Sequence, residues 1–184
     1  MTWKDDVVEK LKEYEGSVSH MYLDSVGLVT VGIGSLLQRA EDAQKLPFMV
    51  RDSGAPANAE QILHEWELLA AMQQNNYAAS YFKRFTDLEL SDEAIAQQTI
   101  DHLEHFYDGL VREVDGFDDY PEASKKAIMD MTFNLGLNGV VRKFPKFITA
   151  FRNKEWAICK EQCNRRGIAT ARNEYVKGLF GSLT

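Results

Sequence analysis

Apolar residues near the start of the chain recur at the spacing of one helix face. Val7, Leu11 and Tyr14 are three or four residues apart, which is typical of an amphipathic helix. Acidic residues crowd the first turn, where they favour a helix N-terminus, and Gly16 follows as a stop signal. The pattern therefore predicts a helix over residues 5–15.

The apolar pattern then changes to one that is typical of strands. Residues 21–23 and 28–31 are short apolar runs, and the polar segment Asp24–Gly27 between them has the composition of a turn. Gly32 and Gly34 give the backbone room to bend after the second run. We expect a short β-hairpin here, and hence only a small sheet.

Capping residues predict where the later helices begin. Asn58 and Gln61 resemble a capping box that opens a helix to about residue 74, with a break at Asn75–Asn76. Residues 38–58 are expected to be mostly loop. The other predicted helices cover residues 91–114, 121–135, 144–152, 154–165 and the segment from 171 onward. The expected fold class is α+β and mainly helical.

Composition and charge narrow the choice of function. The chain has 184 residues, of which 45% are hydrophobic and 27% charged, as in ordinary globular proteins. No apolar run of about 18 residues predicts a transmembrane helix, and the acidic N-terminus does not resemble a secretory signal. The net charge of −7 disfavours nucleic acid and anionic membranes as partners, because both require clustered cations.

Cysteine and histidine spacing does not indicate a metal or redox centre. Cys159 and Cys163 are too few for a disulfide framework, and we interpret them as two small buried hydrophobic residues. His102 and His105 are three residues apart and lack the adjacent Glu of a helical zinc-protease motif. We therefore expect no metal and no cofactor. Arg165 either contacts a substrate or lies at a helix C-terminus, where cations are favoured.

Three polar residues around the predicted hairpin carry the most chemistry. Glycoside hydrolysis needs one carboxylic acid to protonate the leaving oxygen and one carboxylate to act on water or on the positive transition state. Glu15, at the end of a helix beside an apolar hairpin, is a candidate acid that partial desolvation would keep protonated. Asp24 in the turn is a candidate base, and the hydroxyl of Thr30 could hold the attacking water.

The same residues carry a resemblance to a known family. The chain reads Glu15, eight residues, Asp24, five residues, Thr30, then Gly32–Gly34 and Leu36–Leu37. This stretch resembles the phage T4-type lysozymes, which form glycoside hydrolase family 24, and the related bacteriocin pesticin. Residues 127–136, with the following Gly139, Phe144 and Trp156, are similar to the long core helix and later helices of that family.

The resemblance implies a fold and further site residues. The fold would be a single lysozyme-like domain with a hairpin lobe (1–58), a helical lobe (59–184) and a cleft between them. Leu36 and Phe133 would bind the substrate, and Arg172 would pair with the catalytic Glu15. Residues 38–120 are not covered. The acidic net charge also departs from the phage enzyme, which is strongly basic, and Ser35 stands where the family often has His.

The expected activity is that of a muramidase, which hydrolyses the bond between N-acetylmuramic acid and N-acetylglucosamine, with inversion implied by the resemblance. The expected partner is the peptidoglycan glycan strand, with an immunity protein if the chain is an antibacterial effector or bacteriocin rather than a phage endolysin. A monomer is expected, made in the cytoplasm and acting in the cell wall after delivery or membrane lesion. A lytic transglycosylase and a non-catalytic wall-binding module are the alternatives.

Overall fold

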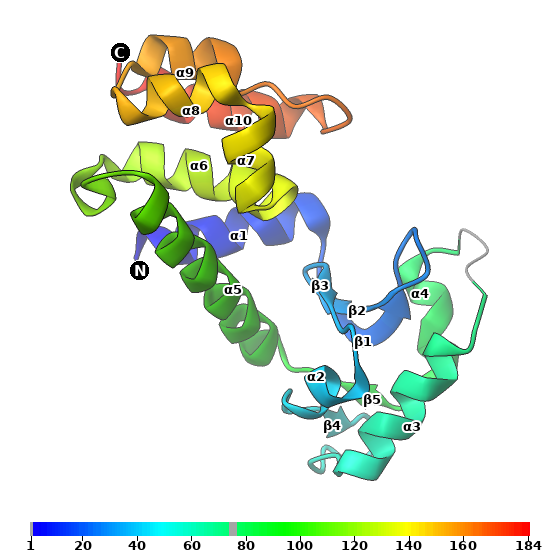
Figure 1. Ribbon diagram of the computed structural model, residues 1–184. Helices are drawn as coiled ribbons and strands as arrows, with labels where there is room; N and C mark the ends of the chain where they lie inside the picture. Colours follow the sequence, from blue (N-terminus) through cyan, green and yellow to red (C-terminus); the bar gives the residue numbers. More distant parts are fainter. Residues whose placement is uncertain (1, 74–76) are drawn as a thin grey trace. The chain divides into compact units, whose positions relative to one another are not determined.

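The computed structural model describes residues 2–73 and 77–184, and it is a mainly helical α+β protein (Figure 1). The predicted fold class is confirmed at that level. The longer helices are α1 (Trp3–Glu15), α3 (Ala59–Ala70), α5 (Asp92–Glu113), α6 (Glu122–Leu135), α8 (Pro145–Arg152) and α10 (Thr170–Gly181). The shorter helices are α2 (Ala40–Gln44), α4 (Ala79–Phe82), α7 (Leu137–Lys143), α9 (Trp156–Gln162), and the 3-10 turns η1 (Lys83–Phe85) and η2 (Phe117–Asp119). The strands are β1 (Val18–Leu23), β2 (Val29–Gly32), β3 (Ser35–Leu36), β4 (Met49–Val50) and β5 (Leu88–Glu89).

The chain forms two compact units, which we describe separately. The hairpin unit contains residues 15–99, and the helical unit combines residues 1–14 with residues 100–184. This division differs from the predicted lobes, 1–58 and 59–184. The physical reason is that α3 packs against β1 and β2, so that it belongs with the hairpin.

The hairpin unit is built on a three-stranded antiparallel sheet in the order β1-β2-β3. The strand pairing places Tyr22 opposite Thr30 and Thr30 opposite Leu36, and an irregularity interrupts β1 between Val18 and Tyr22. Helices α3 and α4 pack against β1. Strands β4 and β5 form a second, two-stranded sheet. The buried core of this unit includes Met21, Leu23, Val31, Ile33, Leu69, Phe82 and Ile95.

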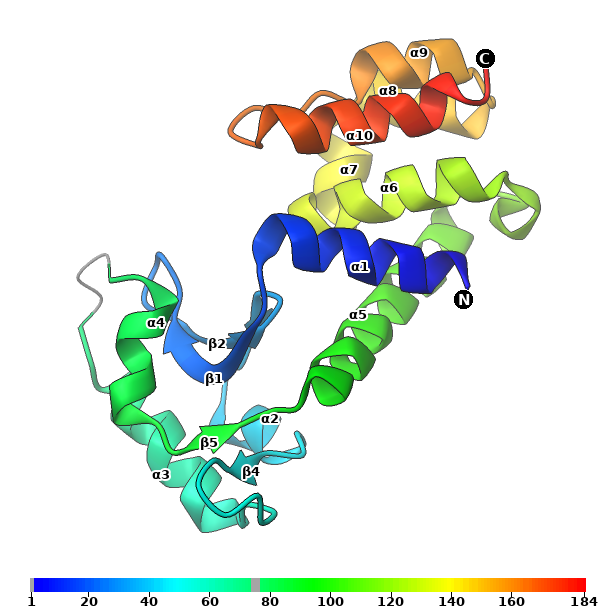
Figure 2. The ribbon, with the colours of Figure 1, turned by 180° about the vertical axis from the view of Figure 1, so that it is seen from behind.

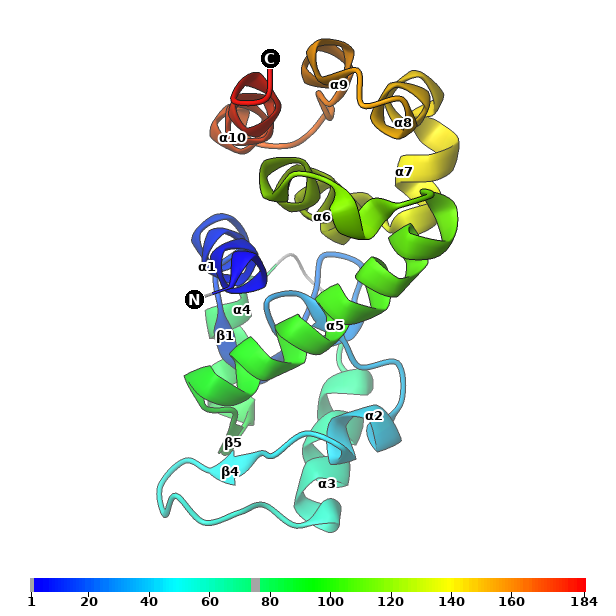
Figure 3. The same cartoon turned by 90° about the vertical axis from the view of Figure 1, so that its left-hand side faces the viewer.

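The helical unit is held together by apolar and aromatic packing. Helix α10 packs against both α6 and α9, and α8 packs against α9 (Figures 2 and 3). Aromatic rings from four of its segments pack at centroid distances between 5.2 and 6.3 Å. These rings belong to Phe117, Tyr120, Phe147, Phe151, Trp156 and Phe180. Burial of this kind is the main stabilising contribution in a globular protein.

Local signals explain several helix boundaries. Both bonds of the predicted capping box between Asn58 and Gln61 are present, each at 2.9 Å. The hydroxyl of Ser91 accepts from the amide of Ala94 at the start of α5. Gly16 and Gly136, which follow α1 and α6, have φ of 73° and 70°, a region that favours glycine. Helix α3 ends at Ala70, four residues before the predicted end near residue 74. The expected break at Asn75–Asn76 lies outside the described residues.

The segment 38–58, expected to be mostly loop, contains two short elements. Helix α2 packs against α3, and β4 pairs with β5. An element of two to five residues carries too little periodicity to be read from sequence, and β4 forms only because the chain returns to it about forty residues later.

The two cysteines are buried with free thiols, which confirms the interpretation of both as small hydrophobic residues. Burial raises the pKa of Cys159 to about 12. Among the helices of the described ranges, none combines the length and apolar character needed to span a membrane.

Candidate functional site

Glu15 is the last residue of α1, and the left-handed backbone of Gly16 turns the chain from this helix into β1. The side chain of Glu15 is exposed. The partial desolvation expected of a proton donor is therefore not provided by burial in this structure. Since the helix ends here, the carboxyl group stands at the junction of a rigid helix and the sheet.

The β1–β2 turn holds the carboxylate of Asp24 by hydrogen bonds. Its Oδ1 accepts from the amides of Val26 at 3.0 Å and Leu28 at 2.9 Å. The turn is closed by the backbone bonds between Asp24 and Gly27 and between Asp24 and Leu28. Charge-assisted bonds to backbone amides fix a carboxylate in one orientation. The half-buried Asp24 is therefore a preorganised acceptor at the tip of the hairpin.

Thr30 lies in β2 and is only 2% exposed. Its hydroxyl donates to the carbonyl of Leu28 at 3.0 Å. A hydroxyl has one donor and two acceptor positions, so the oxygen of Thr30 can still accept a bond from a water molecule. Thr30 can therefore orient a water only as an acceptor.

Tyr22 lies in the same cross-strand row as two of the predicted residues, Thr30 and Leu36, and was not predicted from the sequence. Side chains directly opposite each other in antiparallel strands share one face, so Tyr22, Thr30 and Leu36 form a row across the sheet. Burial raises the pKa of Tyr22, and the negative charges of Asp24 and Glu15 raise it further. Charges act on a pKa through space, so Glu15 and Asp24 both contribute to the electrostatic surroundings of this phenol.

The alternation of side chains in a strand was the signal that could have identified Tyr22. In a strand, Tyr22 lies on the same face as His20 and on the opposite face from Met21, so the face that it occupies could be predicted. The pairing partner depends on the length of the β1–β2 turn, which places Leu23 opposite Val29 and hence Tyr22 opposite Thr30.

A pocket of about 340 Å³ opens beside the hairpin turn. Its lining includes Leu28, Leu36, Gln38 and Trp66, and the indole of Trp66 donates to the carbonyl of Leu37 at 3.0 Å. Leu36, the predicted substrate residue, is 38% exposed at this pocket. The volume falls within the usual range of small-ligand sites, and the mixed aliphatic, aromatic and amide lining suits an amphipathic ligand.

The helical unit holds the other two predicted residues. Phe133, in α6, is half-buried and packs edge-on against Phe106. Arg172, in α10, is buried, and its Nε donates to Asp130 at 3.0 and 3.3 Å. Its guanidinium also lies 5.7 Å from the ring of Tyr14, the residue before Glu15. The pairing of Arg172 with Glu15 remains a prediction.

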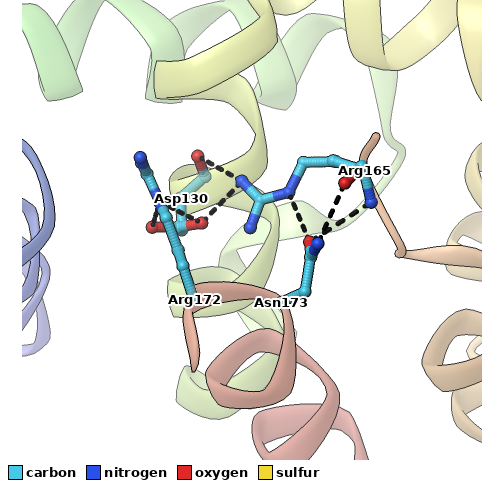
Figure 4. A network of polar contacts seen from close by, with 4 residues as sticks. All are labelled: Asp130, Arg165, Arg172 and Asn173. Carbon is cyan, nitrogen blue, oxygen red and sulfur yellow. Dashed lines mark hydrogen bonds and ion pairs between the residues drawn. The ribbon is translucent and has the colours of Figure 1, made fainter. Parts of the chain in front are cut away.

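Asp130 also binds a second buried arginine (Figure 4). The Nη1 of Arg165 lies 2.7 Å from Asp130, and its Nε donates to Asn173. Arg165 thus fits neither expectation, since it is almost fully buried within the unit. This network was not identified from the sequence, because its members are between 1 and 43 positions apart and carry no shared motif.

Thus four predicted residues, Glu15, Asp24, Thr30 and Leu36, belong to the hairpin unit, while Phe133 and Arg172 belong to the helical unit. Within the part of the chain that the structure describes, no group of three or more His, Cys, Asp or Glu side chains is arranged to hold a metal ion.

Comparison with known proteins assigns no family to this chain. No protein-family model matches this chain, and no curated protein matches it either.

Proposed function

We propose that this protein is a muramidase that hydrolyses the β-1,4 bond between N-acetylmuramic acid and N-acetylglucosamine in peptidoglycan. The observation that carries the proposal is the geometry of the hairpin. Two backbone amides hold Asp24 in the β1–β2 turn, and Thr30 lies opposite Leu36, which lines the neighbouring pocket. Glycoside hydrolysis requires two carboxyl groups in different surroundings, and the exposed Glu15 and the half-buried, hydrogen-bonded Asp24 meet that requirement.

Glu15 is the proposed proton donor to the glycosidic oxygen. It is exposed in the free protein, so the desolvation that favours a neutral carboxyl group has to come from the substrate. A bound glycan strand would cover the end of α1 and exclude water from Glu15. The neutral, proton-donating form of Glu15 would then be favoured only in the complex with the glycan strand.

Asp24 and Thr30 are the proposed pair that orients the attacking water. The water would donate one hydrogen to the carboxylate of Asp24 and the other to the hydroxyl oxygen of Thr30, whose own hydrogen is engaged by Leu28. Its lone pair would then point away from both and toward the anomeric carbon. A water held between base and sugar produces inversion, which agrees with the family resemblance.

The finer parts of the proposal rest on the resemblance. They are the lysozyme-like arrangement of two lobes around a cleft, substrate contacts from Leu36 and Phe133, and orientation of Glu15 by Arg172. No cofactor is required for the proposed chemistry. The proposed site of action is the bacterial cell wall, reached as an effector or bacteriocin domain or as an endolysin. An effector would be accompanied by an immunity protein.

Digestion of purified sacculi tests the proposal. The wild type should release disaccharide muropeptides with reducing ends, and Glu15→Gln should release none while keeping its circular dichroism and thermal transition. Glu13→Gln is the matched control, because it makes the same change two residues earlier in α1, at an exposed side chain paired with Lys10; it should remain active.

The products separate the alternatives. Release of 1,6-anhydro ends would identify a lytic transglycosylase and contradict hydrolysis. Binding of the wild type to sacculi with no release of fragments would identify a wall-binding module. A folded Glu15→Gln variant with full activity would exclude Glu15 as the proton donor.

A further inference from the structure

The net charge of this protein is confined to one unit. Residues 15–99 contain five Lys and Arg against twelve Asp and Glu, whereas the rest of the chain contains sixteen of each. The hairpin unit thus carries the whole charge of −7. Intact peptidoglycan is also anionic, because its stem peptides carry carboxylates. A muramidase with its base on this unit therefore needs a local cation to hold its substrate.

Three of the five cations of the hairpin unit are already paired. Arg39 and Lys45 both lie within ion-pair distance of Asp42, at 3.9 and 3.0 Å, and Arg51 lies 3.3 Å from Glu89. The remaining two, Lys83 and Arg84, are adjacent in η1 and exposed. Over residues 2–73 and 77–184, neither has a carboxylate within ion-pair distance.

Aromatic stacking holds Arg84 in place. Its guanidinium carbon lies 4.3 Å from the centroid of the Tyr81 ring, and its Nε donates to the carbonyl of Tyr81 at 3.2 Å. Tyr81 in turn stacks on Tyr77, with centroids 3.8 Å apart and planes at 17°. A stacked guanidinium loses less freedom on binding and presents its terminal nitrogens as a fork that matches a carboxylate.

This cationic patch, formed by Lys83 and Arg84 on the stacked rings, lies on the element that flanks the hairpin. Helix α4, which leads into η1, packs against β1, and the imidazole of His20 lies 3.0 Å from the carbonyl of Ala79. Both α4 and η1 pack against β1, the strand that leads into the turn carrying Asp24.

We propose that Lys83 and Arg84 bind a carboxylate of the peptidoglycan stem peptide and so anchor the glycan strand to the hairpin unit. This inference rests on the proposed function. An anionic ligand is favoured because, among the residues that the structure describes, these two cations of an otherwise acidic unit have no carboxylate within ion-pair distance. The exposed ring of Tyr77, at 43%, offers an apolar surface beside them for the attached sugar or peptide.

Co-sedimentation with sacculi tests the patch. The parent protein carries Glu15→Gln, so that sacculi are not digested during the measurement. Adding Lys83→Ala and Arg84→Ala should weaken binding about fivefold, which is about 1 kcal/mol for two exposed charge contacts. The matched control, Arg39→Ala with Lys45→Ala, changes the net charge of the same unit equally and should change binding less than twofold.

A second substrate shows whether carboxylates are involved. On sacculi whose carboxylates have been converted to amides, the parent and the patch variant should bind equally. Equal binding of the two proteins to untreated sacculi would overturn the proposal and direct the patch to another partner, such as an acidic protein. An equal loss in the control variant, or an undiminished difference on amidated sacculi, would also overturn it.

The two proposals fail in different ways. If the protein with Glu15 intact releases muropeptides but the patch variant binds normally, only the stem-peptide contact is wrong. If the protein with Glu15 intact neither binds nor cleaves any sacculi, the muramidase proposal itself is wrong.

Discussion

At the scale of the residue, a substitution of Asp24 can separate its proposed role as a base from its structural role in the turn. The two amides of Val26 and Leu28 donate to its Oδ1, and the amide oxygen of an asparagine can accept both bonds. The negative charge, however, is what the proposed base needs to take a proton from water.

Asp24→Asn should therefore keep the fold and lose hydrolysis. We expect a fall in kcat of at least about 100-fold, the usual contribution of a general base, and a change in unfolding free energy below about 1 kcal/mol. Muropeptide release and urea denaturation measure the two quantities. Asp24→Ala is the control for the turn: it removes both roles and should also lower stability. Retention of full activity in Asp24→Asn would exclude Asp24 as the base.

Glu65 is a buried carboxyl group with a structural role. It lies in α3 at 6% exposure and accepts bonds from the backbone amides of Asp87 and Leu88, which attaches the helix to β5. Burial raises the pKa of Glu65, although these two bonds and the charge of Arg51 oppose the rise. The neutral form is thus favoured more in the folded than in the unfolded chain.

This shift has a defined sign for stability. A carboxyl group whose pKa is higher in the folded state contributes stability that is fully present below its unfolded pKa and is lost as the pH rises through the folded pKa. The unfolding free energy of the wild type, measured relative to Glu65→Gln by urea denaturation, should therefore fall between pH 4 and pH 7. The glutamine variant removes this titration alone, so a constant difference across that range would contradict the assignment.

At the scale of the element, Asp130 joins α6 to α10 and to the loop before it. Its carboxylate binds both Arg165 and Arg172, and all three side chains are at least 96% buried. Removing one partner from a buried ion cluster leaves uncompensated charge, whereas an exposed pair contributes little.

Asp130→Asn should lower the unfolding free energy by about 3–5 kcal/mol, because two buried guanidinium groups lose their counter-charge. Glu174→Gln, which breaks the exposed pair with Lys177 on the same helix, should cost less than about 1 kcal/mol. Chemical denaturation of the two variants gives the comparison. Similar small losses in both would mean that the buried cluster contributes no more than a surface pair.

At the scale of the whole molecule, the uneven charge distribution should affect how the protein approaches the proposed substrate. The hairpin unit bears the entire net charge of −7, and the helical unit contains equal numbers of acidic and basic residues. Repulsion between like charges acts over a Debye length, which shrinks from about 30 Å at 0.01 M salt to about 10 Å at 0.1 M.

Hydrolysis of intact sacculi should therefore become faster as salt rises over this range, because screening reduces the repulsion between the hairpin unit and the anionic wall. Initial rates of muropeptide release at several salt concentrations measure the effect. Amidated sacculi, which lack the carboxylates that repel the hairpin unit, are the control and should not be hydrolysed faster as salt rises. A rate that falls on intact sacculi as salt increases would show that local attraction outweighs the repulsion of the unit.

The sequence by itself determined those features that depend on neighbours in the chain. The capping residues Asn58 and Ser91 and the stop at Gly136 located helix ends, because a cap is satisfied within four residues. Two short apolar runs with a polar turn between them identified the hairpin and placed Asp24 in its turn. The mainly helical α+β class followed from these elements.

Only the tertiary structure decided which distant residues meet. The pairing of β4 with β5 and the binding of Arg165 and Arg172 by Asp130 join segments that no local pattern relates. Such contacts are fixed by the burial of apolar surface and by strand register over the whole chain. Spacing in the sequence therefore identified candidate groups, while the folded chain determined their partners.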